Sequence, residues 1–423
     1  ARYLGRLGQR HLVEFTLFDA DVERDRFGQE LFTEILTPVG TQNLFILGDQ
    51  RSTRRGGANV RGSTGLGERL EWRWGAETER ETTTYDYRYV GRSREPPFSG
   101  QSDIVFIEDE IEQDRFGFYS EAQWQLRTDT TLSGGARYDT DDLSGDSALM
   151  PRLGLSVRAG RSVWRASWSR VTDFPSSHEL QLADFEETLP TPETSDFASL
   201  GYERAWGGHR LAIEAYSQKT EDPRLRFVSL FRSVSRFPEL EIDRLRVDAD
   251  ESRNQGLEAR YGFRGQRYEV SAAYELSRFE DKQLDGSWRP RISDRRHSLQ
   301  LWLVAELPYG LHADLLWRGV SGRPTTALDT ELATVDFASG LGEINGERLP
   351  WEHRLDLRLS REWKIGPTNI RVMLGFDNLF DKRNTLGLRL FQLFPYDQVP
   401  SPEVLIAERS LGREHRWSLE FSW

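Results

Sequence analysis

The sequence predicts an all-β protein: an antiparallel transmembrane β-barrel of the outer-membrane type, with about 16 strands. Three observations predict this fold. Apolar and polar residues alternate over many short stretches, short turns alternate with long polar connections, and the chain ends inside a strand with large apolar residues.

The last seven residues form the clearest strand. Trp417, Leu419, Phe421 and Trp423 alternate with Ser418, Glu420 and Ser422. Successive side chains of a strand point to opposite faces, so the large apolar groups share one face. A face of this kind fits lipid, although the same pattern could pack on a soluble core. The rest of the chain must therefore decide between the two.

Alternation with a period of two predicts the other strands. They lie near residues 10–22, 47–64, 68–83, 113–126, 130–140, 149–158, 161–171, 193–205, 209–219, 253–264, 267–279, 293–305, 309–319, 350–362 and 367–377, before the last strand at 412–423. Tight turns such as Pro308–Gly310 and Lys364–Pro367 join strands in pairs.

Long polar segments separate these hairpins, at about residues 24–46, 84–112, 172–192, 220–252, 320–349 and 378–410. Loops of this length are unusual in a compact soluble domain. Short periplasmic turns and long extracellular loops are the layout of an outer-membrane barrel. A soluble propeller is the alternative, but it would need a repeat of blade length.

Composition agrees with a barrel. The chain has 423 residues, 37% of them hydrophobic, and its mean hydropathy is −0.63. A barrel strand exposes only every second residue to lipid, so a hydrophilic average is compatible with it. Aromatic residues make up 12% of the chain, with 13 Trp. We expect interfacial belts of aromatic residues, with these members: Trp206, Tyr268, Tyr309, Trp363 and Trp423.

Other functional classes find little support. The chain has no cysteine, so it has neither a disulfide nor a thiolate metal site. Its net charge of −12 argues against a nucleic-acid partner. Its 7 histidines show no metal-ligand spacing. Acidic runs at 108–110 and 248–251 could bind Ca²⁺, but solvated loop charge is the commoner explanation. No catalytic motif is present, so we expect neither an enzyme nor a cofactor.

Several short stretches together resemble a known family. They are Phe116–Glu121 followed by Leu132–Asp139, which ends in Gly-x-Arg-Tyr-Asp; Thr172–Leu180; Pro192–Ser195; Leu200–Glu203; Asn378–Lys382, with its Asn-Leu-Phe-Asp; and the terminal aromatic Trp423. Their order and spacing from about residue 68 to 423 resemble the C-terminal barrel of TonB-dependent outer-membrane receptors.

The resemblance implies a barrel of 22 strands behind an N-terminal plug that engages TonB. Residues 1–60 resemble no plug, so we predict that residues 1–423 form a single barrel domain. Residues 1–7 read as the tail of an earlier strand. Either the N-terminal part lies elsewhere, which we favour, or this is a plugless relative closed by fewer strands. In both cases the last strand must pair with a first one.

The resemblance implies uptake of a scarce, bulky nutrient such as a metal–siderophore complex at the bacterial outer membrane. A structural or docking subunit of a larger envelope assembly and a passive porin-like channel are the alternatives. The expected partners are outer-membrane lipid, the barrel assembly machinery at the C-terminal strand, TonB through a plug that this chain does not show, and other envelope subunits.

Four arginines on predicted inward positions are the candidate ligand-binding residues: Arg260, Arg318, Arg354 and Arg371. Guanidinium groups recognise carboxylate and phosphate well. Ion pairs within the wall are the competing explanation, and we expect Arg260 to pair with Glu258, Arg318 with Asp314, Arg354 with Asp356, and Arg371 with Asp377.

Overall fold

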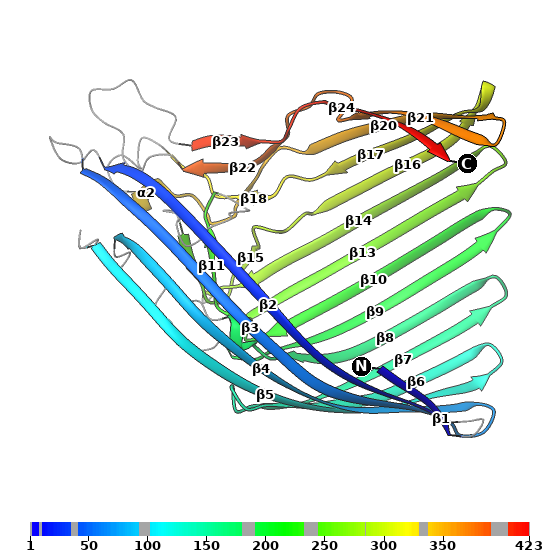
Figure 1. Ribbon diagram of the computed structural model, residues 1–423, viewed down its shortest axis with the longest axis horizontal. Helices are drawn as coiled ribbons and strands as arrows, with labels where there is room; N and C mark the ends of the chain where they lie inside the picture. Colours follow the sequence, from blue (N-terminus) through cyan, green and yellow to red (C-terminus); the bar gives the residue numbers. More distant parts are fainter. Residues whose placement is uncertain are drawn as a thin grey trace.

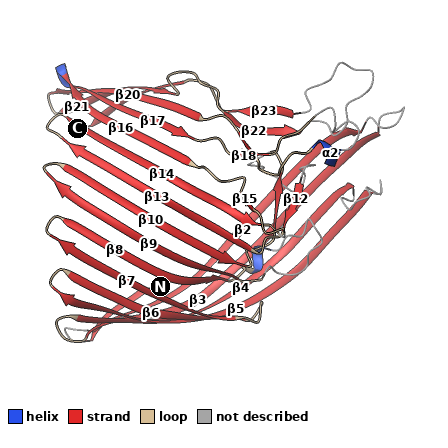
Figure 2. Ribbon diagram, turned by 180° about the vertical axis from the view of Figure 1, so that it is seen from behind, coloured by secondary structure: helices blue, strands red, loops and turns tan. Residues whose placement is uncertain are grey.

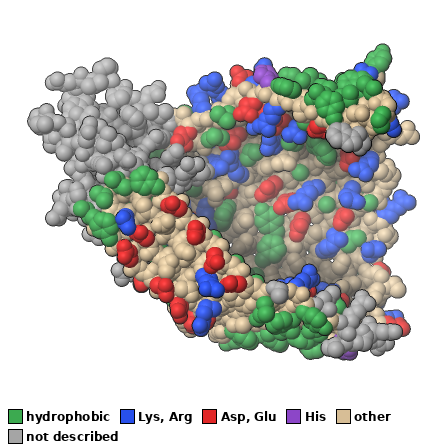
Figure 3. Space-filling model, viewed as in Figure 1, with side chains coloured by type: hydrophobic (Ala, Val, Ile, Leu, Met, Phe, Trp, Pro, Cys, Tyr) green, Lys and Arg blue, Asp and Glu red, His purple; other side chains and the backbone are tan. Residues whose placement is uncertain are grey.

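The strands of the chain form one curved antiparallel wall. The computed structural model describes residues 2–7, 11–34, 41–92, 102–179, 191–231, 244–283, 285–329, 337–390 and 405–422. Within these ranges, an 18-stranded sheet surrounds a hollow (Figures 1 and 3). No helix in the described ranges is long and apolar enough to span a membrane.

The strands of the wall have the following bounds: β1 Arg2–Leu7, β2 His11–Glu34, β3 Thr41–Gly65, β4 Leu70–Arg92, β5 Ser102–Arg127, β6 Thr130–Asp141, β7 Ser147–Ala159, β8 Ser162–Asp173, β9 Glu193–Trp206, β10 His209–Glu221, β13 Glu251–Arg264, β14 Tyr268–Lys282, β15 Trp288–Pro290, β16 His297–Leu307, β17 Leu311–Val320, β20 Glu352–Ile365, β21 Thr368–Asp377 and β24 Glu414–Ser422.

Smaller elements lie in the connections: β11 Arg226–Ser229 with β12 Arg244–Val247, β18 Pro324–Thr325 with β19 Glu347–Arg348, β22 Thr385–Leu390 with β23 Leu405–Arg409, and the short helices η1 Ser177–Glu179, η4 Pro308–Gly310 and α2 Phe337–Gly340. Most long connections lie at one end of the wall and the tight turns at the other (Figure 2). We call these the loop end and the turn end.

The predicted strands are confirmed. Each of the 16 ranges overlaps one strand of the wall, and β1 and β15 complete the 18 strands. β1 pairs with β2 from Arg2 opposite Thr16 to Leu7 opposite His11. Among the described residues, β1 pairs only with β2, and β24 only with β21. The described sheet is therefore open between these two strands.

Two of the predicted loops are wrong in part. Most of segments 24–46 and 84–112 continues the strands β2 to β5, which are 23 to 26 residues long. Cross-strand polar contacts stabilise these extensions. Arg26 on β2 bonds Asp49 on β3 at 3.0 Å, and Thr53 and Thr83 are 3.1 Å apart. Paired charges of this kind look like loop composition in the sequence, although they are strand pairs.

The apolar face of these long strands changes sides. Near the turn end of β4, Trp72 and Trp74 lie on the outer face, whereas further along Tyr85, Tyr87 and Tyr89 point inward. The three inward tyrosines are only 4%, 1% and 5% exposed. A change of face after about Thr78 marks the level where the outer surface stops being apolar. Beyond that level, the strands form a mainly polar blade above the apolar band, with exposed apolar side chains such as Phe106 near its tip.

Rows of aromatic rings border the apolar band on the outer face. At the loop end, Trp351 stacks between His297 and His353, with ring centroids 5.7 and 6.3 Å apart. The ten residue-to-residue steps of β20 from His353 to Trp363 span about 33 Å along the strand. At a tilt of about 40° this is about 25 Å, the height of the apolar band of outer-membrane barrels.

Four of the five predicted interface aromatics lie at the turn end. Trp206 and Tyr268 belong to one row of rings, with His209 and Phe263 between them. Tyr309 is 87% exposed in its turn. Trp363 lies 4.9 Å beneath the Arg361 guanidinium. Trp423 is outside the described residues. The contact of all five with a membrane interface stays a prediction.

An arginine placed on either face of β16 tests which face of the wall contacts lipid. Leu303 lies on the outer face near the middle of the band, and Gln300 lies on the inner face. We expect Leu303→Arg to cost about 2–4 kcal/mol, because a guanidinium would then enter lipid. Gln300→Arg should change stability by less than about 1 kcal/mol. Urea titration in lipid vesicles measures both, and equal losses would contradict the orientation.

Candidate ligand-binding site

A pocket of about 530 Å³ lies at the loop end. It is bounded by the β11–β12 pair, by residues of and around β15, and by Ile344 and Asn345. Its lining residues are Arg226, Val228, Leu245, Arg246, Val247, Asp248, Asp281, Gln283, Asp285, Arg289, Pro290, Arg291, Ile292, Ser293, Ile344 and Asn345. Its volume is that of a small-molecule site. We call it the Asp281 pocket.

Two arginines share one carboxylate in this pocket. Asp281 is only 3% exposed and forms ion pairs with both Arg226 and Arg291. The Arg291 Nε–Asp281 Oδ1 distance is 2.8 Å. The trio therefore carries one positive charge that Asp281 does not balance. Burial, with the charge of Arg291 as the next cause, lowers the pKa of Arg226. A bound anion would stabilise this group.

The same arrangement recurs next to the pocket. Asp294, which is 1% exposed, pairs with Arg348 and lies 3.9 Å from the Arg296 guanidinium. Each of the two buried carboxylates thus contacts two guanidinium groups. The mouth of the wall is locally rich in positive charge, although the whole chain carries −12.

The rest of the pocket is amphipathic. Leu245 and Ile344 line it and also pack against the buried pair Leu230 and Phe231. Part of the lining is therefore apolar and continuous with a small core, while the charged lining residues are four arginines and three aspartates, with a net charge of +1. Guanidinium groups bind carboxylate and phosphate oxygens through paired hydrogen bonds. The arrangement suits an anion with an apolar part. Among the described residues, no three His, Asp or Glu side chains are grouped to hold a metal ion.

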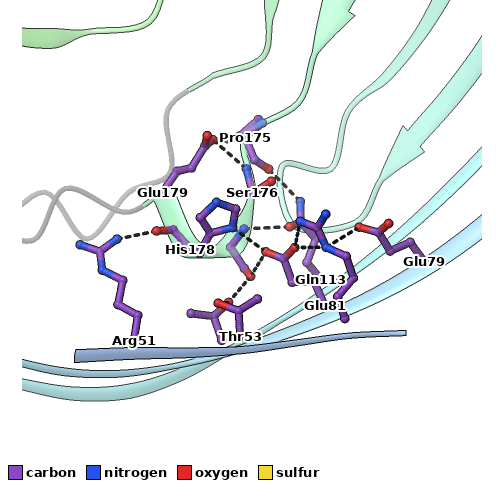
Figure 4. Close-up of polar contacts among 12 residues, drawn as sticks. Arg51, Thr53, Glu79, Glu81, Gln113, Pro175, Ser176, His178 and Glu179 are labelled. Carbon is purple, nitrogen blue, oxygen red and sulfur yellow. Dashed lines mark hydrogen bonds and ion pairs between the residues drawn. The ribbon is translucent and has the colours of Figure 1, made fainter. Parts of the chain in front are cut away.

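A second polar cluster fixes the connection between β8 and β9 to the inner wall (Figure 4). The helix η1 lies against β3, β4 and β5, and its first residue, Ser177, is fully buried. The Ser177 hydroxyl donates to Glu81 at 2.6 Å, and the Ser177 N–H donates to Gln113 at 2.9 Å. We call this cluster the η1 lock.

Further contacts complete the η1 lock. Gln113 Nε2 donates to the Pro175 carbonyl at 2.8 Å, the Tyr85 hydroxyl donates to the Ser177 carbonyl, and Arg51 donates to the His178 carbonyl. Burial alone would raise the pKa of Glu81, but hydrogen bonds from Ser177, Arg55 and His178 lower it to about 2. Strand residues far apart in sequence therefore hold one turn of the connection in place.

The structure brings two of the four predicted arginines together. Arg318 on β17 lies directly opposite Arg354 on β20, and both bond Asp356, at 2.9 and 2.6 Å. The predicted pair of Arg354 with Asp356 is confirmed. The pair of Arg318 with Asp314 is wrong, because the carboxylate on the neighbouring strand is the one that Arg318 reaches.

The other two predicted arginines lie apart from this group. Arg260 bonds Glu258 at 2.7 Å, as predicted. Arg371 does not pair with Asp377, whose partners are Arg354 at 3.5 Å and Arg416 at 2.9 Å. Arg371 instead faces Glu362 and Glu420 in register on the strands at either side. None of the four lines the Asp281 pocket.

Sequence reasoning missed the arginines of the pocket. A signal was present, since four of the eight residues from Arg289 to Arg296 are arginine. Arg289 and Arg291 fall between the predicted strands 267–279 and 293–305, and the other two arginines fall inside the second of these strands, so the run was not among the long connections. The sharing of Asp281 with Arg226, 55 positions earlier in the sequence, has no signature in the sequence.

Comparison with known proteins identifies the family. The family model described as TonB-dependent receptor-like, β-barrel, matches residues 11–379. The chain belongs to this family. TonB-dependent receptors are transport proteins of the Gram-negative outer membrane rather than enzymes, which places the wall in that membrane, with the loop end outside the cell. A search of curated proteins found no match.

Solved TonB-dependent receptors share the fold at low sequence identity. The FpvA receptor of P. aeruginosa, in complex with a ferric heterologous pyoverdine, is 13% identical with a TM-score of 0.65, over 99% of this chain and 55% of that one. BauA of Acinetobacter baumannii, a ferric preacinetobactin receptor, is 12% identical with a TM-score of 0.65, over 99% and 61%. The unliganded ferric citrate transporter FecA is 13% identical with a TM-score of 0.68, over 99% and 60%. The chain thus spans little more than half of these receptors.

The η1 lock predicts an acid-sensitive connection in this receptor barrel. Glu81 has a pKa of about 2 when folded and 4.5 as its ordinary value. Its charge therefore stabilises the lock above pH 4.5, and this contribution is lost as the pH falls from 4.5 to about 2. Glu81→Gln should lose about 1–3 kcal/mol of protection at pH 7 and show no further loss over that pH range.

Hydrogen exchange of residues 173–179, corrected for intrinsic rates, measures this protection. Glu79→Gln is the matched control, because Glu79 lies one strand repeat away and, among the described residues, its ion pair is with Arg55 at 3.3 Å and not with η1. The lock would be refuted if both variants exchanged like the native chain.

Proposed function

We propose that this chain is the barrel of an outer-membrane receptor that takes up a scarce, bulky, anionic nutrient such as a metal–siderophore complex. The observation that carries the proposal is the Asp281 pocket, where Arg226 and Arg291 share one buried carboxylate at the extracellular mouth. The names of the similar receptors support it, since those proteins are described as binding or transporting ferric pyoverdine, preacinetobactin or citrate.

The proposed partners follow from the family. We treat residues 1–423 as one barrel domain, whose lumen receives a plug and whose transport is driven through TonB. The charged inner face, with groups such as Arg318, Arg354 and Asp356, offers a polar surface to such a plug (Figure 3). Outer-membrane lipid contacts the apolar band. Arg260, Arg318, Arg354 and Arg371 stay candidates for guiding an anionic ligand through the lumen.

Removal of the two pocket arginines tests the site. The double variant Arg226→Ala/Arg291→Ala should bind ferric citrate or another tested ferric chelate at least about 10-fold more weakly, because charged hydrogen bonds contribute about 1.5–3 kcal/mol each. The control is Arg264→Ala, which removes an exposed ion pair with Glu269 at the turn end. Titration calorimetry in detergent and growth under iron limitation measure the effect.

Three results would contradict the proposal. Equal affinity of both variants would exclude the pocket as the capture site. A large, ungated conductance in planar bilayers would indicate a passive porin. Stable co-purification with envelope proteins, without a growth defect on deletion, would indicate a structural subunit.

The C-terminal strand is the proposed signal for the barrel assembly machinery. Among its residues, Trp417, Leu419 and Phe421 share the outer face. Deletion of Trp423 should reduce the inserted fraction at least about threefold without changing the refolded protein in detergent, because the signal acts in assembly and not in the fold. Quantitative blotting of outer-membrane fractions measures it. Normal insertion would count against this role.

A further inference from the structure

The strand β5 is paired on both sides over only half of its length. It pairs with β4 from Ser102 to Trp124, but with β6 only from Arg115 onward. In the described part of the chain, residues 102–114 therefore have a neighbour on one side alone. Figure 1 shows this segment as the lower margin of the blade, beyond the ends of β6 to β10.

Backbone geometry shows which residues face this free edge. The Asp114 N–H donates to the Asp142 carboxylate at 2.6 Å, and the Asp114 carbonyl accepts from the Asp142 N–H at 3.1 Å. Both backbone groups of Asp114 thus point away from β4. In an antiparallel strand this direction repeats at every second residue, so Glu112, Glu110 and Glu108 direct their backbone groups to the same edge.

The side chains of these residues give the edge its charge. Glu108, Glu110, Glu112 and Asp114 follow one another on the outer face. Asp114 pairs with Arg80 on β4 at 2.7 Å. The residues of β4 opposite the other three are Asp86, Thr84 and Thr82, none of which is basic. Arg80 and Arg88 of β4 also attract Glu112 and Glu108, but Arg88 itself pairs with Asp86. The row is therefore a ladder of carboxylates that keeps a net negative charge.

The opposite face and the composition of the segment suit strand addition. Ile107 and Ile111 point inward, opposite the buried Tyr87 and Thr83, with Asp109 between them on this face. The segment from Ile104 to Asp114 contains neither Pro nor Gly, the residues that interrupt a strand. One donor is already satisfied, because the Glu110 N–H bonds its neighbour Asp109 at 2.8 Å. A partner carbonyl could replace this local bond.

We propose that the free edge of β5 binds an extended segment of another protein as an added strand, with Lys or Arg at every second position and apolar residues between. Unpaired backbone groups at a sheet edge favour strand addition. Opposite charges on adjacent strands add about 0.2–1 kcal/mol per pair. A second copy of this chain is disfavoured, because its own acidic ladder would lie against the first. The site is independent of the transport ligand.

The test uses the full chain in nonionic detergent and a nine-residue peptide of alternating Lys and Val. We expect saturable binding at low salt. Two further peptides carry a methyl group on the backbone nitrogen, one at its lysines and the other at its valines. Both keep every side-chain charge, and each loses the backbone N–H donors of the methylated residues. Because a strand bonds a single edge through alternate residues, one of the two methylated peptides should bind at least about 10-fold more weakly.

Protein variants locate the site. The triple variant Glu108→Lys/Glu110→Lys/Glu112→Lys should weaken peptide binding at least about 10-fold. The control variant Asp146→Lys/Glu343→Lys/Glu347→Lys makes the same charge change at exposed acids elsewhere at the loop end and should alter binding less than about twofold. Glu110→Pro removes an N–H that faces the free edge and leaves the backbone hydrogen bonds between β5 and β4 in place, and it should also abolish binding.

A competing edge is included in the same experiment. Beyond Thr16, β2 is also paired on one side only among the described residues, and it carries outward acids at Asp21, Glu23 and Asp25. The proposal would be overturned if the variant Asp21→Lys/Glu23→Lys/Asp25→Lys lost peptide binding while the triple variant of β5 bound the peptide like the native chain. Equal binding of all three peptides, or no binding at 1 mM peptide, would overturn it as well. Heat-modifiable migration on gels confirms that each variant is folded.

Discussion

The lateral backbone ladder is the constraint on which the whole structure depends. Each long strand satisfies its N–H and carbonyl groups only through its neighbours, and the registers run without interruption over most pairs. An uninterrupted register fixes which residues share a face, so it sets the apolar outer band and the charged interior together. Where the backbone pairing ends on one side, as at residues 102–114 of β5, exposed backbone groups become available to other chains.

Sequence alone predicted most of the wall because its signal is local. Leu355, Leu357 and Leu359 alternate with Arg354, Asp356 and Arg358, and this pattern requires no knowledge of the neighbouring strand. The prediction was wrong where the pattern changed face. In β4, Tyr85, Tyr87 and Tyr89 have the opposite parity to Trp72 and Trp74, so the combined segment lost its apparent period and its polar part was assigned to a loop.

The candidate sites could not be predicted in the same way, because they depend on contacts between distant segments. The Asp281 pocket unites β11, β12, β14 and the residues around β15. Arg318 illustrates the limit within the wall itself: an acid four positions away in the same strand, Asp314, looked like its partner, but the strand register brings Asp356 closer. Four positions along a strand correspond to about 13 Å, whereas the adjacent strand is about 5 Å away.

The aromatic row at the loop end gives the protein an intrinsic optical reporter. Trp351 is stacked between His297 and His353, with ring planes within 15° and 13° of parallel. The fluorescence of an indole depends on the groups packed against its ring. Because the chain has 13 Trp, the difference in emission between the native chain and a Trp351→Phe variant isolates this stack, and it reports whether the loop-end border of the apolar band stays packed.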